Sequence, residues 1–311
     1  YPTLAEAFAE INALGLNGDL TLVLTGSYTE PGTTSMIGRW SEVGGTNYSV
    51  TIYPQTDVTI TASAPGSGVI NIVGSRNLII DGRINGAGVG NHLTLQNTSL
   101  SSNSTGVLFT GMAANNVTLR NLNIQNDNNF ATNTEGQSYG IRFSNQNSTN
   151  INITNNKIKK ATYGIYLNTS ARCSNINISE NIIGSNNSDQ YIIASGIYVK
   201  NANGVNISKN EIQNVRQGSP YTIGANGIFC TKAVNLLIEK NKIYGIYQSN
   251  PDANWSTGGA IGISIYDSCA SVSVLNNAIW DVRIIDYNGW ITQYAAVGIR
   301  FYNDYNTTVS G

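Results

Sequence analysis

Apolar and polar residues alternate along most of the chain, and the alternation is organised around a recurring tetrad. The tetrad has the form Gly-[Ile/Val]-x-apolar and first occurs as Gly106-Val107-Leu108-Phe109. Its later copies begin at Gly140, Gly164, Gly196, Gly227, Gly262 and Gly298. Successive side chains of a β-strand point to opposite faces, so apolar residues at every second position are typical of strands. The pattern therefore predicts a series of short strands.

A second alternating segment follows each tetrad, and an Asn comes three residues after the last five of these segments. An Ile always follows two residues later. The five residues are Asn156, Asn181, Asn210, Asn241 and Asn277. Strands in successive coils lie roughly 4.8 Å apart, so each Asn can hydrogen-bond to its equivalent one coil away. We expect a buried Asn ladder; the alternative is that Asn adopts a left-handed conformation at a sharp turn.

This repeat resembles the coils of the right-handed parallel β-helix proteins of the pectate-lyase-like superfamily. The resemblance implies an all-β fold, a single-stranded right-handed parallel β-helix, over nearly the whole chain. The opening segment has apolar residues at helical spacing instead. We expect residues 3–15 to form an amphipathic helix that covers the open end of the β-helix. Residues 1–60 are then the cap helix and first strands, and residues 61–311 the continuous coils.

The two ends of the sequence suggest further expectations. The opening Tyr1-Pro2-Thr3-Leu4 looks like the start of large secreted or surface β-helix proteins of Bacteroidota-type bacteria, and a start without Met is expected of a trimmed product. We therefore expect an extracellular or cell-surface location. At the other end, a coil begins at Gly298 and is unfinished at residue 311. We expect either that the chain continues or that copies associate end to end.

Composition excludes several classes of function. The chain has 44 Asn and 32 Gly, but only 17 Lys+Arg and 18 Asp+Glu, with a net charge of -1. A protein without a basic surface has no means of binding the nucleic-acid backbone, so we expect no nucleic-acid partner. Apolar runs are all shorter than the roughly 18 residues that a membrane span needs, so we also expect no span.

Candidate chemistry lies on the outward side of the tetrads, where the third residues form one column. Tyr166 and Tyr198 are predicted to be adjacent there, with Arg142 beside them and Lys200 two residues further on. In β-helix polysaccharide lyases, which the repeat resembles, such residues abstract a proton, so these four are the candidates if the chain is a lyase. The expected ligand-binding aromatic residues are Tyr166, Tyr198, Phe229, Tyr266, Trp255 and Trp290. The alternative is that these rings only pack against each other on a strand surface.

Metal and cofactor chemistry has weak support in the sequence. The paired Asp residues and the Gly-His-Gly of polygalacturonase-like enzymes are absent, as are the calcium-binding Asp clusters of pectate lyases. His92, the single histidine, has no carboxylate near it in sequence. Asp127 and Glu135 are the only weak metal candidates, through their oxygens. We expect no cofactor.

The three cysteines are Cys173, Cys230 and Cys269. Cys173 and Cys269 occupy equivalent positions three coils apart, which is roughly 14 Å at the strand spacing and beyond disulfide reach. We expect three thiols, buried or half-buried.

Two functions fit these patterns. The first is a non-enzymatic extracellular surface protein, adhesive or structural and possibly filament-forming, whose partners are other copies of the chain or a cell-surface glycan or protein. It follows from the low charge and the missing catalytic carboxylates. The alternative is a carbohydrate-active enzyme similar to polysaccharide lyases, or a glycan-binding module, acting on the outward aromatic and basic face. The first is our expectation.

Overall fold

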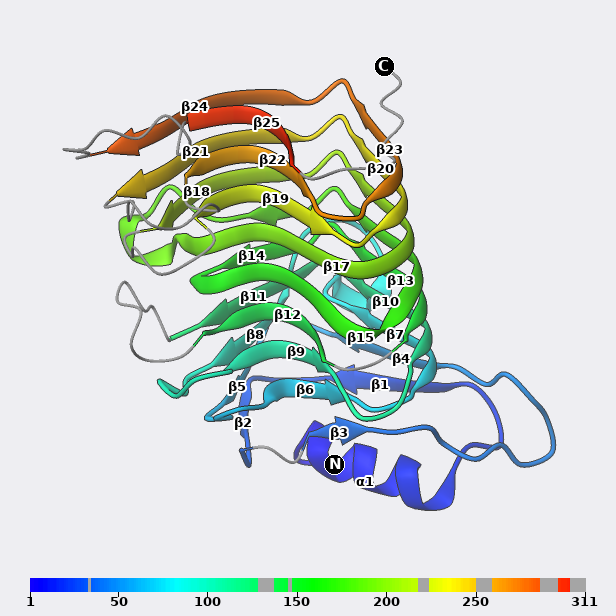
Figure 1. Ribbon diagram of the computed structural model, residues 1–311. Helices are drawn as coiled ribbons and strands as arrows, with labels where there is room; N and C mark the ends of the chain where they lie inside the picture. The colour runs from blue at the N-terminus through cyan, green and yellow to red at the C-terminus, as the bar shows by residue number, and fades with distance from the viewer. Residues whose placement is uncertain are drawn as a thin grey trace.

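The alternating segments form short strands, and each strand pairs in parallel with its equivalent in the next coil. The computed structural model describes residues 1–32, 35–127, 137–144, 147–217, 224–249, 259–285 and 296–302. These residues wind as a parallel β-helix, stacked from the N-terminal coil to the C-terminal one (Figure 1). The fold is therefore the all-β parallel β-helix that the repeat predicts.

Three parallel sheets form the walls of the β-helix. The first sheet consists of β1 (Leu20–Leu24), β4 (Val50–Pro54), β7 (Arg76–Asp81), β10 (Asn115–Arg120), β13 (Thr149–Thr154), the later parts of β15 (Ala161–Ser179) and β17 (Ile192–Ser208), β20 (Val234–Glu239) and β23 (Ala270–Leu275). The second sheet consists of β2 (Tyr28–Glu30), β5 (Val58–Ala62), β8 (Leu93–Asn97), β11 (Leu122–Asn126), β14 (Lys157–Lys159), β16 (Ile182–Ile183), β18 (Glu211–Gln217), β21 (Lys242–Ser249) and β24 (Ala278–Ile285). The third sheet consists of β3 (Met36–Ile37), β6 (Gly68–Ile72), β9 (Thr105–Phe109), β12 (Tyr139–Ser144), the early parts of β15 and β17, β19 (Ala225–Thr231), β22 (Ala260–Tyr266) and β25 (Ala296–Tyr302). Two short 3₁₀ helices, η1 (Ile84–Gly86) and η2 (Ser188–Gln190), lie between strands.

The N-terminal helix closes one end of the β-helix. Helix α1 (Leu4–Leu14) lies against the first coil (Figure 1), and its Phe8 is completely buried in the core. The hydroxyl of Thr3 caps the helix, and the buried carboxylate of Glu30 accepts the N–H of its first residue at 2.9 Å. The predicted cap helix is thus confirmed. No helix among the described residues is long and apolar enough to cross a membrane.

The coils begin well before residue 61, where the sequence places their start. β1 pairs in parallel with β4, and β2 with β5, so β1 to β3 already form a coil of the same three sheets. The first strands are therefore part of the β-helix, and within residues 1–60 the helix α1 is the element that serves as a cap.

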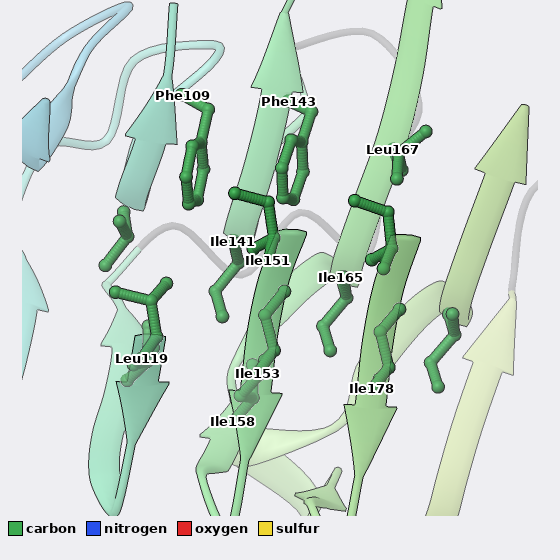
Figure 2. Close-up of a cluster of buried hydrophobic side chains, with 14 of the residues drawn as sticks. Phe109, Leu119, Ile141, Phe143, Ile151, Ile153, Ile158, Ile165, Leu167 and Ile178 are labelled. Atoms are coloured by element: carbon green, nitrogen blue, oxygen red, sulfur yellow. The ribbon is translucent and has the colours of Figure 1, made fainter. Parts of the chain in front are cut away.

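The tetrads place one Ile of each coil in a single inward column. The column pairs Ile141, Ile165, Ile197, Ile228, Ile263 and Ile299 in register. Figure 2 shows Ile141 and Ile165 beside inward residues of the facing strands, including Ile151 and Ile178. All members are fully buried except Ile299, which is 42% exposed in the last described coil. Ile299 is exposed because no described strand covers β25 on its outer side.

The tetrad glycines, apart from Gly298 in the last described coil, are required by close packing between coils. A Cβ atom added to Gly140 would lie 2.3 Å from Cγ2 of Ile158 and 2.5 Å from the carbonyl oxygen of Gly164. Neither neighbour can move without disturbing the core, so only a residue without a side chain fits here.

The five ladder Asn side chains form one hydrogen-bonded column inside the turn between the first and second sheets. Asn210 is representative: its Nδ2 donates to Oδ1 of Asn241 at 3.0 Å and to the carbonyl of Ile178 at 2.9 Å. The same bonds recur at the other ladder positions. Positive φ angles occur at the preceding residues, such as Lys209 and Lys240, and not at the ladder Asn. The ladder therefore serves hydrogen bonding, and the alternative of a left-handed Asn does not apply.

All three cysteines are buried thiols, as the coil spacing predicts. Burial raises the pKa of the Cys230 thiol well above its ordinary value, so this thiol stays neutral in the core.

Candidate functional site

The predicted outward column lies on adjacent strands of the third sheet. In register it reads Leu108, Arg142, Tyr166, Tyr198, Phe229, Ser264 and Arg300. Phe229 is only 3% exposed and Ser264 is fully buried. The third sheet is therefore a partly covered surface and not the open solvent face that the sequence suggests.

Aromatic rings on the third sheet stack on one another along the β-helix axis. The ring centroids of Tyr166 and Tyr198 are 4.7 Å apart, those of Tyr198 and Phe229 5.1 Å, and those of Phe229 and Tyr266 5.7 Å. We call this series, with Tyr139, Tyr163 and Tyr302, the aromatic stack. Tyr198, Phe229 and Tyr266 each lie between two stacked neighbours, so their flat faces are already in contact. Interior rings of the stack present edges to a ligand.

The four lyase candidates are brought onto neighbouring strands, and the environment of the two tyrosines works against proton abstraction by their phenols. Burial raises the pKa of the Tyr166 and Tyr198 phenols, so both stay protonated near neutral pH. The Tyr166 hydroxyl accepts a hydrogen bond from an amide at 2.7 Å, and Arg142 donates to Asn103 Oδ1 at 3.0 Å. Lys200 is half-buried on the same strand as Tyr198. A tyrosine base needs a lowered pKa, and this arrangement gives the opposite.

The metal candidates do not come together as a site in the described part of the chain. Asp127 accepts a hydrogen bond from Gln96 Nε2 at 2.9 Å and lies 3.8 Å from Lys160 Nζ. Its carboxylate is therefore already partnered. Glu135, Trp255 and Trp290 lie outside the described residues. Among the described residues, no three His, Cys, Asp or Glu side chains gather where they could hold a metal ion.

His92 has a carboxylate partner in the preceding coil, although no carboxylate is near it in the sequence. His92 Nδ1 lies 2.7 Å from Oδ1 of Asp57, which occupies the matching position one coil earlier. The Asp57 side chain is 87% exposed. A pair so open to water has the character of a surface contact.

A long polar groove lies on the outward face of the second sheet, and none of its lining residues is among the predicted site residues. It has a volume of about 640 Å³. Hydroxyl, amide and ammonium groups from β5 to β18 dominate its lining: Thr59, Thr94, Gln96, Asn123, Gln125, Lys157, Lys159, Gln190 and Gln213. A smaller hollow of about 380 Å³ adjoins it and shares Lys157. This surface is from here called the groove.

The groove contains cations without neighbouring anions in its lining. Lys159 Nζ donates to Gln190 Oε1 at 3.1 Å, and Gln190 also accepts from the Ser185 hydroxyl at 3.2 Å. Lys157 is exposed and makes no ion pair within the described residues. No Asp or Glu is among the residues that line the groove. The lining is therefore neutral to positive.

An aromatic pair extends the groove toward the C-terminal coils. The Tyr244 hydroxyl lies 2.7 Å from Oε1 of Glu211 and 2.8 Å from Oε1 of Gln213, and its ring stacks on Trp280 with the centroids 4.5 Å apart. Trp280 is 46% exposed and lies in β24, the last described strand of the second sheet. Trp280 is exposed because no described strand covers β24 on its outer side.

Comparison with known proteins defines the class. The family described as right handed beta helix region matches residues 128–311, which is more than half of the chain, so the chain belongs to this family. No curated protein matches the chain.

Solved structures share the fold at low identity. An alginate lyase from Paenibacillus sp. str. FPU-7 is similar over 99% of this chain and 96% of its own, with 14% identity and a TM-score of 0.49. Endopolygalacturonase I from Stereum purpureum is similar over 99% of this chain and 97% of its own, with 15% identity and a TM-score of 0.39. The A-module of a mannuronan C-5 epimerase from Azotobacter vinelandii is similar over 99% of this chain and 95% of its own, with 14% identity and a TM-score of 0.34.

These findings correct the expected function. The named structures are a lyase, a polygalacturonase and an epimerase module, and none of the three is an adhesive or structural surface protein. The expectation of a non-enzymatic surface protein is overturned in favour of its carbohydrate-active alternative. Similarity at this level describes a shared fold, and the activity of this chain depends on its own side chains.

Proposed function

We propose that the chain is a carbohydrate-active protein that binds a glycan along the groove. The observation that carries this proposal is the lining of the groove, which presents hydroxyl, amide and ammonium groups on adjacent coils over about 640 Å³. Sugar hydroxyls both donate and accept hydrogen bonds, and Asn and Gln amides do the same. A sugar also has an apolar face, which suits the open ring of Trp280.

The direction of the groove supports a polymeric ligand. Its lining follows the second sheet from Thr59 in β5 to Gln213 in β18, so equivalent side chains repeat along the axis of the β-helix. A polymer of repeating sugar units could contact equivalent side chains on successive coils. We include a secreted or cell-surface location in the proposal, because an extracellular polysaccharide would be reached there.

Cleavage of the glycan by the third-sheet residues is the weaker part of the carbohydrate-active hypothesis. The raised pKa values of Tyr166 and Tyr198 work against their role as bases. A lyase would release unsaturated uronides, which absorb in the ultraviolet. We expect binding to be the activity that is detected first.

Affinity electrophoresis in gels that contain different polysaccharides tests the proposal. We expect at least one polysaccharide to retard the wild-type protein, and Gln190→Ala to reduce the retardation because it removes an amide from the groove. The matched control is Asn168→Ala, which removes an amide from the third sheet. Equal loss in both variants, or no retardation by any polysaccharide, contradicts the proposal. Ultraviolet absorbance of the same mixtures reports any lyase activity.

A further inference from the structure

Arg216 lies between two tyrosine rings at the edge of the groove. Its guanidinium carbon is 4.1 Å from the ring centroid of Tyr191 and 4.6 Å from that of Tyr247. Tyr247 is the register partner of Arg216 in the next coil, and Tyr191 comes from the preceding coil. The guanidinium is thus held from both sides by cation–π contacts, which fix its plane.

Most N–H donors of the Arg216 guanidinium have no acceptor among the described residues. Within the described residues its one polar contact is a long hydrogen bond from Nη2 to Asn214 Oδ1, at 3.4 Å. Asp281, which accepts a hydrogen bond from the Tyr247 hydroxyl, is also paired with Arg283. A guanidinium carries five N–H donors, and Arg216 is exposed to solvent. Its edge is therefore open to an external acceptor.

Arg216 is connected to the groove through its neighbours in the chain and in space. Tyr191 follows Gln190, and Asn214 follows Gln213; both glutamines line the groove. Asn214 is itself held by a hydrogen bond to Asn186 Oδ1 at 2.9 Å. A ligand that extends past Gln190 or Gln213 would therefore approach Arg216.

We propose that Arg216 recognises an oxyanion on the glycan, a carboxylate or a sulfate ester, and makes the groove selective for acidic glycans. The inference rests on the proposed function. A planar guanidinium matches the two oxygens of a carboxylate or sulfate, and its charge-assisted hydrogen bonds are stronger than neutral ones. Because the two rings already orient Arg216, less conformational entropy is lost on binding.

Calorimetric titration of the full chain with acidic oligosaccharides and their neutral counterparts tests this inference. One arm uses uronate oligomers and their methyl esters, and the other uses sulfated oligomers and the same oligomers without sulfate. We expect Arg216→Gln to weaken binding of the acidic member by about tenfold or more and to leave the neutral member unchanged. The arm that responds identifies the oxyanion.

Three further variants separate orientation from charge. Arg216→Lys keeps the charge but loses the planar fork, so we expect it to recover only part of the acidic affinity. Tyr191→Ala should weaken acidic ligands alone, because it removes one ring that orients Arg216. Arg172→Gln, at an exposed turn within β15, is the matched control and should bind as wild type.

The outcomes distinguish the two proposals. Binding of neutral and acidic members with equal affinity, or Arg216→Gln indistinguishable from wild type, overturns the role of Arg216 and leaves glycan binding intact. Failure of the wild-type protein to bind any member of either pair overturns the proposed function and this inference together. Melting temperatures of all variants exclude unfolding as the cause.

Discussion

The third sheet and the second sheet carry similar aromatic side chains but use them differently. On the third sheet Tyr198 lies against Phe229 with the ring planes only 7° apart, and both rings cover each other. On the second sheet the Tyr244 and Trp280 rings also stack, but Trp280 ends the series with 46% of its surface exposed. Aromatic residues on a β-helix therefore indicate binding only where the stack leaves a ring face or a donor unused.

Phe229→Ala should give the largest effect and test the structural side of this comparison. The ring is 3% exposed and lies between Tyr198 and Tyr266, so its removal leaves a cavity in the stack. We expect a loss of about 3–5 kcal/mol in the free energy of unfolding, measured by urea denaturation. Glycan affinity of the folded variant should be unchanged. A reduced affinity in folded protein would mean that the third sheet is the binding face.

Asn210→Ala should cost less and should affect neither face selectively. Its removal leaves the buried N–H of Asn181 and Nδ2 of Asn181 without their acceptor, Asn210 Oδ1, which costs about 1–3 kcal/mol. Asn17→Ala, at an exposed Asn outside the left-handed region, is the control and should change stability by less than about 0.5 kcal/mol. Equal melting temperatures for the two variants would show that the ladder contributes little to stability.

Trp280→Ala should reduce glycan affinity and leave stability nearly unchanged, the opposite of what we expect for Phe229→Ala. The ring is exposed, so we expect little change in stability, but a loss of glycan affinity of about 1 kcal/mol, since one stacking surface is removed. Calorimetry with the polysaccharide that retards the protein measures this effect. Tyr266→Ala on the third sheet is the matched aromatic control. Greater loss of affinity in Tyr266→Ala than in Trp280→Ala would exchange the roles of the two sheets.

Alkaline titration should give the smallest effect. Burial raises the pKa of Tyr139, in the aromatic stack, to about 12, above the ordinary value of 10.0. A phenol with a raised folded-state pKa favours folding while it is protonated, so its contribution is complete below pH 10 and is lost as the pH rises toward 12. Melting temperatures should therefore decline above pH 10, and Tyr139→Phe should decline less. Parallel curves for the two proteins would contradict this assignment.

The sequence predicts the coils well because they repeat. Gly140 and Asn210 recur with their neighbours at equivalent positions, so strand register, the inward Ile column and the Asn ladder follow from one pattern. Contacts between unlike positions do not repeat. The pairing of His92 with Asp57 depends on the number of residues in the intervening coil, and no local motif reports it.

The groove escaped prediction for a related reason. Its strands in the second sheet are short, and β14 contributes only two outward residues, Lys157 and Lys159. Two lysines separated by one Ile resemble any solvated strand. The position of Arg216 depends on a left-handed residue at Asn214, which changes the course of β18 and brings Arg216 to the ring of Tyr191. A sequence pattern does not contain that change of course.

The parallel register of the coils has a consequence for how such a surface can change length. Each added coil advances the wall by one strand spacing, roughly 4.8 Å, and shifts no other residue from its face. Insertion of a single residue within a strand would instead exchange its inward and outward sets. The groove can therefore lengthen or shorten only by whole coils. A deletion of residues 181–209, from one ladder Asn to the residue before the next, should rejoin the coils in register and shorten the groove by one step.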